Sequence, residues 1–473
     1  MRKTKIVCTI GPATDNEDIM RQLMLEGMDV ARFNFSHSDH EVHRARFEMI
    51  KKLRKELDLP IATMLDTKGP EIRLGQFKDN KPVIIQDGET FTLTTEQVEG
   101  TKDISSITFK DLPKDVKPGT AILINDGVIE LKCKKVNGNE IACDIVHGGT
   151  VSNNKGVNVP GIKLSMPYIS ERDMADLEFG AKMQFDFIAA SFVRTAADIM
   201  YLRNITKSLG WYNPRIIAKI ENIDGVNNID EILEVADGIM IARGDMGVEI
   251  PFEQIPAIQK ELIHKAYNAG KQVITATQML ESMMTNPRPT RAEITDVANA
   301  IYDGTSAIML SGETAAGKYP IDTVKTMSLI ARTTEEDINY ISRFSKRDTD
   351  SNTDITNAIS HATVTTAHDL NANAIITVTK TGTTARMISK YRPNCPIIGC
   401  TTEETILRQL NMSWGIIPVL VEEKTNTDVL FSHAVETAVK KGLIQFNDLV
   451  VITAGVPLGM SGTTNLLKVA HVG

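Results

Sequence analysis

The stretch that decides the fold is residues 216–249, IIAKIENIDGVNNIDEILEVADGIMIARGDMGVE. Its two short apolar runs, at 216–220 and 238–242, are separated by a helix-patterned segment over 227–235. This order predicts a strand, a crossover helix and a parallel strand. Side chains alternate between the faces of a strand, so Lys219 and Glu221 point the same way, and Asp245 follows the end of the second strand. The stretch therefore predicts that one lysine and two carboxylates meet at neighbouring strand ends.

Two interpretations of this cluster stay open on the residues alone. A Lys-x-Glu pair in a strand is most often a structural salt bridge or part of a solvated face. Two converging carboxylates repel each other, however, and the usual remedy is a bound divalent cation held by oxygen ligands. Glu221 and Asp245 are therefore candidate ligands of Mg²⁺.

The alternation of apolar runs and helix-patterned segments extends over most of the first 340 residues. We expect strands at 5–11, 30–35, 61–65, 185–190, 215–220, 238–242, 272–276 and 306–310. Helix-patterned sequence follows each strand, for example at 17–26, 40–56 and 323–336, and Ser170 is expected to begin another helix. Eight parallel β/α units close most economically into a (β/α)8 TIM barrel, in which the chemistry lies on the loops at the strand C-termini.

The rest of the chain predicts two further domains. Between 71 and 165 the helix pattern gives way to short β-rich runs, and Asn137-Gly138 is the signal of a tight hairpin. After a polar stretch at 342–353, buried strands are expected at 374–378, 397–400, 416–420 and 449–453, with helices between them. The predicted α/β architecture is a barrel of residues 1–69 and 166–341, an inserted small β-barrel lid at 70–165, and a C-terminal open α/β domain at 342–473.

The amino-acid composition excludes several classes of protein. The net charge of -8, without a block of Lys or Arg, argues against a nucleic-acid binder. The five cysteines are scattered without C-x-x-C spacing, which argues against a disulfide framework or a zinc site. No apolar run reaches the roughly 18 residues of a membrane span, and no signal peptide is evident. We expect a soluble cytoplasmic protein with small-molecule partners and no nucleic-acid or membrane partner.

Several longer motifs carry a family resemblance: KTKIVCTIGPAT at 3–14, ARFNFSH at 31–37, LDTKGPEIR at 65–73, IIAKIEN at 216–222 and ARGDMGVE at 242–249. On these motifs the whole chain resembles the pyruvate kinase family. The resemblance implies phosphoryl transfer from phosphoenolpyruvate to ADP, giving pyruvate and ATP, the final step of glycolysis. It also implies a homotetramer that is regulated by a phosphorylated small-molecule effector.

The resemblance also assigns roles at the barrel mouth. Glu221 and Asp245 would bind Mg²⁺ or Mn²⁺. Lys219 would face the transferring phosphoryl group rather than pair with Glu221, and Arg32 would contact the phosphate from the opposite side. Thr277 matches the threonine implicated in protonation of the enolate; on local pattern alone it would be a routine strand-end hydroxyl. The expected substrate-binding residues are Arg32, Lys219, Ala242, Arg243, Gly244, Asp245 and Thr277, those at 242–244 acting through their backbone.

Three more sets follow from the same resemblance. Asn34, Ser36, Asp66 and Thr67 match the residues that hold K⁺, and Glu71 predicts that activity depends on K⁺. The nucleotide-side residues are His37, Arg73 and Arg172. The effector phosphate would bind Thr379, Lys380, Thr381, Gly382, Thr383 and Thr384, facing a loop at 459–465. On the residues alone, Asp66 is also compatible with a turn or capping role. The hydroxyls of 379–384 are likewise compatible with a helix N-cap. We expect Glu313 to be structural or to support the site indirectly.

Two other functions compete with this one. Another metal-dependent TIM-barrel enzyme acting on an enolate, of the aldolase or lyase type, would account for Lys219, Glu221 and Asp245 but not for the lid or the K⁺ residues. A catalytically inactive metabolite sensor would predict a broken site. Every position that matches the family is occupied by a workable residue, which favours an active phosphotransferase.

Overall fold

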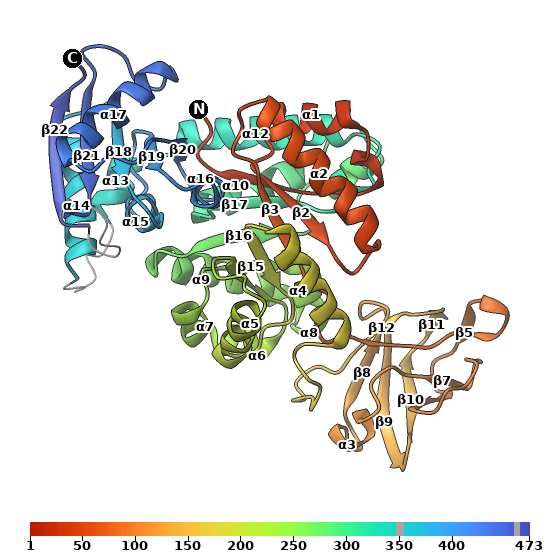
Figure 1. Ribbon diagram of the computed structural model, residues 1–473. Helices are drawn as coiled ribbons and strands as arrows, with labels where there is room; N and C mark the ends of the chain where they lie inside the picture. Colours follow the sequence, from red (N-terminus) through yellow and green to blue (C-terminus); the bar gives the residue numbers. More distant parts are fainter. Residues whose placement is uncertain (347–353, 458–463) are drawn as a thin grey trace.

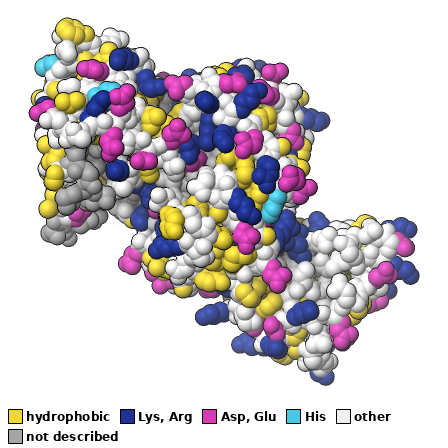
Figure 2. Space-filling model, viewed as in Figure 1, with side chains coloured by type: hydrophobic (Ala, Val, Ile, Leu, Met, Phe, Trp, Pro, Cys, Tyr) yellow, Lys and Arg dark blue, Asp and Glu magenta, His cyan; other side chains and the backbone are white. Residues whose placement is uncertain are grey.

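A computed structural model describes residues 1–346, 354–457 and 464–473. The chain forms a central barrel, a β domain that extends from one side of it, and a C-terminal α/β domain on the other side (Figure 1). Basic and acidic side chains are interspersed on the face shown in Figure 2, without a basic stripe that crosses the domains. Among the described residues, no helix is long and apolar enough to cross a membrane.

Eight parallel strands close the barrel in the order β1-β17-β16-β15-β14-β13-β3-β2. In chain order they are β1 Lys5–Thr9, β2 Val30–Asn34, β3 Ala62–Asp66, β13 Phe187–Ala190, β14 Arg215–Ile220, β15 Gly238–Ala242, β16 Gln272–Ala276 and β17 Ala307–Leu310. Alternate residues such as Met64, Phe187 and Met240 fill the interior, so the barrel is a packed core. The predicted TIM barrel is confirmed.

Helices surround the barrel and connect consecutive strands. They are α1 Glu17–Glu26, α2 His40–Glu56, α4 Glu171–Met183, α5 Ala196–Ser208, α6 Ile223–Asn227, α7 Ile229–Val235, α8 Arg243–Glu249, α9 Ile255–Asn268, α10 Arg291–Asp303, α11 Gly312–Ala315, α12 Pro320–Asp337 and α13 Tyr340–Ser345. Short 3₁₀ helices lie at Pro12–Thr14, Phe252–Gln254 and Glu281–Met284. Ser170 caps α4 through a capping box with Asp173, as expected for a helix start.

The crossover between β14 and β15 differs from the single helix that was expected. Asn228 leaves the helical conformation (φ -98°, ψ 17°) and separates α6 from α7. Its side-chain amide donates to the carbonyl oxygen of Arg194 at 2.9 Å. An asparagine side chain that hydrogen-bonds outside the helix competes with helix continuation, which explains the break.

The inserted β domain has a seven-stranded sheet in the order β4-β12-β8-β9-β10-β6-β7. Its strands are β4 Ile72–Arg73, β6 Thr90–Thr94, β7 Ile104–Ser106, β8 Ala121–Ile124, β9 Ile129–Asn137, β10 Glu140–His147 and β12 Gly156–Asn158. The pair β5 Val83–Ile85 and β11 Gly149–Val151, helix α3 Leu112–Asp115 and the 3₁₀ helix Lys78–Asn80 complete the domain. An antiparallel bridge between Leu74 and Ile107 joins the two edges of the sheet, which therefore curls toward closure. The expected hairpin turns at Gly138-Asn139, where Gly138 has φ +58°.

The C-terminal domain is a five-stranded sheet in the order β20-β19-β18-β21-β22. The strands are β18 Ala374–Val378, β19 Ile397–Thr401, β20 Ile416–Leu420, β21 Leu449–Ala454 and β22 Leu466–His471, with helices α14 Ile355–Asp369, α15 Thr383–Lys390, α16 Glu404–Leu410 and α17 Thr427–Lys440. The four parallel strands were predicted. The antiparallel edge strand β22 was not, because its residues are half-buried or exposed and lack the apolar run of a central strand.

Candidate active site

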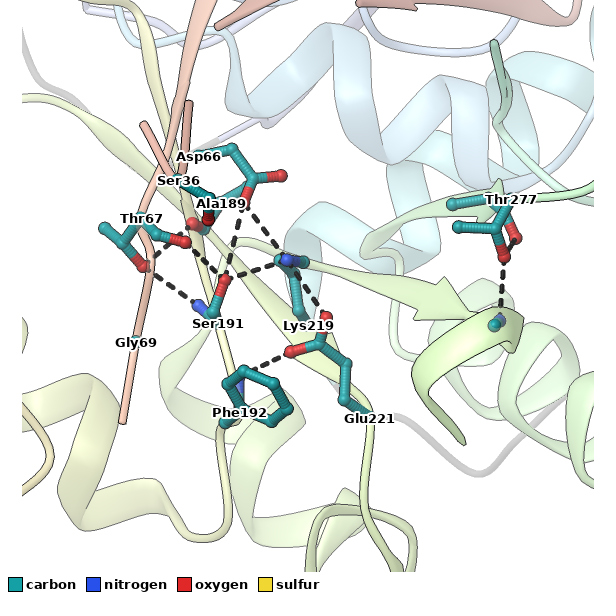
Figure 3. Close-up of polar contacts among 12 residues, drawn as sticks. Ser36, Asp66, Thr67, Gly69, Ala189, Ser191, Phe192, Lys219, Glu221 and Thr277 are labelled. Atoms are coloured by element: carbon teal, nitrogen blue, oxygen red, sulfur yellow. Dashed lines mark hydrogen bonds and ion pairs between the residues drawn. The ribbon is translucent and has the colours of Figure 1, made fainter. Parts of the chain in front are cut away.

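Lys219 lies at the centre of a buried polar network at the C-terminal ends of β2, β3, β13 and β14 (Figure 3). Its Nζ donates to Oδ1 of Asp66 at 3.0 Å and to Oγ of Ser191 at 2.8 Å. Oε1 of Glu221 lies 2.9 Å from the same nitrogen. The other carboxylate oxygen of Asp66 accepts from Nε of Arg32 at 2.6 Å. Two cations and two anions from strands far apart in the sequence thus form one chain of contacts.

One prediction about Lys219 is wrong: the residue pairs with Glu221 in this structure. The two side chains lie on the same face of β14 and its end, and both are buried, with 8% and 1% of their surface exposed. An ammonium group taken out of water needs nearby anions, and Glu221 and Asp66 are the carboxylates within reach. Any group that binds Lys219 therefore has to compete with, or share, these two partners.

The charges in the network determine the protonation states of Lys219 and Asp66. Burial disfavours the charged form of Lys219, but Asp66 and Glu221 outweigh that effect and raise its pKa, so it is a cation at neutral pH. Burial also opposes ionisation of Asp66, yet Arg32 and Lys219 bring the net pKa of this carboxyl below its ordinary value. Lys219 is therefore suited to stabilise negative charge rather than to accept a proton.

Glu221 has features of a metal ligand. Its Oε2 accepts from the backbone N–H of Phe192 at 2.6 Å, and Phe192 takes φ +53° to present that N–H. Its Oε1 is buried and lies 2.9 Å from Nζ of Lys219. Burial raises the pKa of Glu221, and the charge of Asp245 adds to that increase. A divalent cation would relieve the repulsion between the two carboxylates.

Asp245 lies in the first turn of α8, exposed to solvent, and not in the buried network. Its charge nevertheless acts on both Lys219 and Glu221. No group of three or more His, Cys, Asp or Glu side chains that could hold a metal occurs within 1–346, 354–457 and 464–473. A Mg²⁺ ion often keeps few protein carboxylates and completes its octahedron with water and substrate oxygens, so a two-carboxylate site fits this ion.

The predicted K⁺ residues come from two adjacent loops. Oδ1 of Asn34 accepts from the backbone N–H of Ser36 at 3.1 Å, and the carbonyl of Asp66 accepts from Phe35 at 3.0 Å. Oγ1 of Thr67 accepts from the backbone N–H of Ser191 at 3.1 Å. These oxygen atoms suit a hard cation. The Asp66 carboxylate is already shared between Arg32 and Lys219, so an ion bound here would be coupled electrostatically to the network.

The side chain of Arg243 does not face the network. It donates to the carbonyl of Thr277 at 2.7 Å and pairs with Asp296, also at 2.7 Å. The backbone N–H of Gly244 donates to Oγ1 of Thr277 at 2.9 Å. Thr277 takes φ +68°, an unusual backbone conformation for threonine that the surrounding contacts enforce. Arg243 therefore positions the Thr277 loop.

A cleft of about 650 Å³ lies next to these residues. Asp245, Gly244, Thr277 and Gln278 line its barrel side, and Asp126 in the turn after β8 lines it from the inserted domain. The contact between the two domains includes Glu249, at the end of α8, whose carboxylate is hydrogen-bonded to the side chain of Asn158. Burial, reinforced by nearby Asp224, raises the pKa of Glu249 to about 7.

Of the three nucleotide-side residues, two are associated with one loop. His37 is exposed just after β2, and Nη2 of Arg172 donates to the carbonyl of Phe35 in the same loop at 2.9 Å. Arg73 belongs to the inserted domain, where it pairs with Glu71 at 2.7 Å and donates to the carbonyl of Asn154. The structure thus groups His37 with Arg172, whereas the contacts of Arg73 lie within the inserted domain.

The predicted effector loop precedes α15. Gly382, with φ +80°, is the residue before the helix, and its N–H donates to Oγ1 of Thr379 at 3.0 Å. Oγ1 of Thr384 lies 2.8 Å from Oγ1 of Thr464, so the described end of the predicted facing loop does contact it. Residues 459–463 of that loop lie outside the described part of the chain. Lys380 is exposed, with Glu423 at 3.9 Å.

Sequence reasoning missed Ser191. The residue directly follows β13, is buried, and links Lys219, Thr67 and Asp66 through its hydroxyl, which donates to the carbonyl of Thr67 at 2.6 Å. A Cβ on Gly69 would lie 2.8 Å from Cβ of Ser191, so glycine is needed where the chain leaves for the inserted domain. Ser191 is a polar residue just past an apolar strand, the same signal that pointed to the other site residues.

Glu313 has a structural role. Its carboxylate accepts from the backbone N–H groups of Leu280 and Ser311, at 3.2 and 2.7 Å, and ties the loops after β16 and β17 together. Burial raises its pKa.

Comparison with known proteins places this site in a family. A family model described as "Pyruvate kinase, barrel domain" matches residues 1–324, and one described as "Pyruvate kinase, alpha/beta domain" matches residues 357–470. The chain is 49% identical over 473 residues to a pyruvate kinase of Clostridium acetobutylicum, covering all of both chains. It is 50% identical over 475 residues to one of Staphylococcus epidermidis, covering 81% of that relative.

A solved structure agrees with these matches. The crystal structure of a pyruvate kinase from Cryptosporidium parvum superposes with a TM-score of 0.95 at 40% identity, covering 100% of this chain and 96% of the other. Likeness at this level of identity and coverage extends to the barrel, the inserted domain and the C-terminal domain together. The chain belongs to the pyruvate kinase family of phosphotransferases.

Proposed function

We propose that this chain transfers the phosphoryl group of phosphoenolpyruvate to ADP, giving pyruvate and ATP, as the final step of glycolysis in the cytoplasm. The observation that carries the proposal is the buried Arg32–Asp66–Lys219–Glu221 network at the barrel mouth. Both substrates are highly anionic, and two unit charges 4 Å apart repel by about 4 kcal/mol at an effective dielectric near 20. Arg32 and Lys219 supply positive charge at the place where that repulsion has to be overcome.

In the proposed reaction, a β-phosphate oxygen of ADP attacks the phosphorus of phosphoenolpyruvate, and the bond from phosphorus to the enol oxygen breaks. Lys219, held protonated by Asp66 and Glu221, stabilises the charge on the transferring group. Arg32, fixed by Asp66 and by Oγ1 of Thr9 at 2.9 Å, contacts the phosphate from the other side. Ser191 and Asp66 keep the lysine ammonium in place.

Two cations complete the proposed site. Glu221 and Asp245 would hold Mg²⁺ or Mn²⁺, which supplies Lewis-acid stabilisation of the phosphoryl and carboxylate oxygens. Asn34, Ser36, Asp66 and Thr67 would hold K⁺, and Glu71 supports dependence on this ion. His37, Arg73 and Arg172 would bind ADP, and the backbone of 242–244 would receive the substrate carboxylate.

The enolate that remains must gain a proton at carbon. Thr277 is the proposed participant, because its hydroxyl lies on the cleft, fixed by Gly244 and the carbonyl of Ala276. An unperturbed hydroxyl is a poor acid, so we assign the proton delivery to Thr277 together with water.

We also propose that the inserted domain, residues 70–165, closes over the site and excludes water that would hydrolyse the phosphoryl donor. The contact of Asn158 with Glu249 and the position of Asp126 on the cleft support this. Residues 342–473 would form the regulatory domain, in which Thr379–Thr384 bind a phosphorylated small molecule. A homotetramer is the proposed assembly.

The test is formation of ATP from ADP and phosphoenolpyruvate with Mg²⁺ and K⁺, followed by direct detection of both products. Turnover that requires both substrates and stops on chelation of Mg²⁺ supports the proposal. If the folded protein forms neither ATP nor pyruvate under these conditions, the proposal is wrong. Release of pyruvate from another substrate without ATP would instead support the alternative barrel enzyme, which no comparison favours at present.

A further inference from the structure

The loop of residues 35–39, between β2 and α2, carries residues from two of the proposed ligand sets. Ser36 belongs to the proposed K⁺ site, and His37, which is exposed, belongs to the proposed nucleotide site. Helix α2 begins directly after the loop, with Asp39 as its N-cap. A contact that fixes the backbone of this loop therefore acts on both proposed sites.

His43, near the start of α2, makes such a contact. Its Nε2 lies 2.9 Å from the carbonyl oxygen of His37. The side chain is buried, with 1% of its surface exposed. Its ring stacks on that of Phe35, with centroids 4.3 Å apart and 21° between the planes, and meets the ring of Phe33 edge-on at 5.9 Å. Aromatic contacts of these two kinds are favourable, so they hold the imidazole in one orientation under the loop.

The surroundings of His43 also determine which ring nitrogen carries the proton. A carbonyl oxygen can only accept, so Nε2 is the protonated nitrogen and donates to His37. Nδ1 is buried and has no hydrogen-bond partner among the residues the structure describes. Burial, aided by the charge of Arg46, lowers the pKa of His43 to about 4, although the bond to His37 opposes this shift. The ring is therefore a neutral donor at neutral pH.

Two arginines hold the same loop at other points. Nη2 of Arg172 donates to the carbonyl of Phe35 at 2.9 Å. Nη1 of Arg46 donates to Oγ of Ser38 at 3.3 Å. Between these two points, the imidazole holds the carbonyl of His37. The loop is thus fixed along its length by side chains from the helices around the barrel.

We propose that His43 is a positioning residue for ADP and K⁺, because its bond to the His37 carbonyl keeps Ser36 and His37 in the conformation that binds these ligands. The inference rests on the proposed function and extends it to a residue that touches neither ligand. Without the bond, the loop would also adopt other conformations. The apparent affinity for a ligand falls in proportion to the fraction of molecules that remains in the binding conformation.

Two variants separate the hydrogen bond from the packing of the ring. His43→Phe keeps an aromatic ring on Phe35 but has no donor. His43→Gln loses the ring but can place an amide N–H close to the position of Nε2. If His43 served only to fill the core, phenylalanine would be the better replacement. If it positions the loop, glutamine is the better one.

Equilibrium dialysis of the full-length protein with radiolabelled ADP, at saturating Mg²⁺ and K⁺, measures the effect without turnover. We expect His43→Phe to raise the Kd for ADP about 3- to 10-fold, as the loss of one neutral hydrogen bond implies. We expect His43→Gln to bind ADP more tightly than His43→Phe. Wild-type affinity in His43→Phe, or weaker binding by His43→Gln than by His43→Phe, would overturn the inference.

Steady-state ATP formation provides a second readout. In His43→Phe the K⁺ concentration for half-maximal activation should rise, as should the KM for ADP. The KM for phosphoenolpyruvate at saturating K⁺ should rise less, because Arg32 is fixed by other contacts. Equal rises in the two KM values would show a general loss of order in the active site and would overturn the positioning role.

His368→Phe is the matched control. His368 lies in α14 of the C-terminal domain, packs edge-on against Phe344 at 5.2 Å, and accepts from the backbone N–H of Asn394 at 3.0 Å. It is thus another partly buried histidine that is bonded to the backbone and packed on a phenylalanine. Its replacement should leave the KM for ADP and the K⁺ requirement unchanged.

The inference stays testable if His43→Phe does not fold. His43→Asn and His43→Gln both lack the ring, but the shorter asparagine amide takes the place of Nδ1 and cannot reach the His37 carbonyl. Equal affinities of these two variants for ADP would overturn the inference. Wild-type protein that binds no ADP would instead show that the proposed function itself is wrong.

Discussion

Replacement of Ser191 by alanine should reduce turnover while leaving the fold intact. The hydroxyl accepts from Nζ of Lys219 at 2.8 Å and donates to the carbonyl of Thr67 at 2.6 Å. The substitution removes one oxygen from a buried position and introduces no bulk. Asp66 and Glu221 still hold the ammonium, so Lys219 stays charged, but it loses the contact that fixes its position between them.

The size of the effect follows from the bond that is lost. A hydrogen bond to a charged group contributes about 1.5–3 kcal/mol. The contact positions Lys219 in the transition state, so its loss raises the activation free energy by this amount. Because about 1.4 kcal/mol corresponds to a factor of ten in rate, kcat should fall by about 10- to 100-fold. The KM for ADP should change little, because Ser191 contacts none of His37, Arg73 and Arg172, the residues proposed to bind the nucleotide.

The assay is steady-state ATP formation with both substrates varied. Thr305→Val is the matched control, because Thr305 is also buried and hydrogen-bonded, to Thr275 at 3.0 Å and to the carbonyl of Ala307 at 2.9 Å, but lies before β17 at the other end of the barrel. Both variants should lose stability, and only Ser191→Ala should lose kcat. Equal kcat values for Ser191→Ala and wild type would refute the positioning role.

Three further predictions test other parts of the site. Arg32→Lys keeps the charge but cannot donate to Asp66 and Thr9 together, so kcat/KM for phosphoenolpyruvate should fall at least about tenfold in steady-state assays; an unchanged value would remove Arg32 from the phosphate site. The rate of ATP formation by the wild type should be higher in K⁺ than in tetramethylammonium at equal ionic strength. Glu71→Lys should abolish this difference, because the lysine supplies a fixed cation. Equal rates of the wild type in the two salts would contradict the K⁺ assignment. Glu249→Gln should stabilise the protein at pH 8 but not at pH 4. Folding raises the pKa of Glu249 from 4.5 to about 7. Ionisation of Glu249 therefore costs folding stability as the pH rises through that range, and glutamine does not ionise. At about 1.4 kcal/mol per pH unit the gain is at most about 3.5 kcal/mol. Thermal denaturation at the two pH values measures it, and a gain that does not grow with pH would contradict the interpretation.

The barrel strands could be predicted because a strand buried on both faces reads as an apolar run. Runs such as 215–220 and 238–242 coincide with β14 and β15. The edge strand β22 could not be recognised in this way, since it is only partly covered. The break at Asn228 was also missed, because it depends on a contact with Arg194 in another loop.

The candidate site residues could be proposed from the sequence because charged side chains follow apolar strands and the TIM barrel brings strand ends together. The side chains that these residues contact could not be predicted. Lys219 pairs with Asp66 because the closed barrel places β3 within reach of β14, a contact that no local pattern encodes. The turn of Arg243 toward Asp296 likewise depends on α10. Ser191 carries the strand-end signal, but its contacts with Lys219 and Thr67 form only in the folded barrel.

The most direct test of the central claim is the turnover of Lys219→Met compared with wild type at saturating phosphoenolpyruvate and ADP. Mn²⁺ binding, measured in parallel by electron paramagnetic resonance, checks that Glu221 and Asp245 still hold the divalent ion. The account predicts that phosphoryl transfer is lost while Mn²⁺ binding is retained, because the lysine stabilises the transferring group and is not a metal ligand. Full turnover by the folded Lys219→Met variant would contradict it.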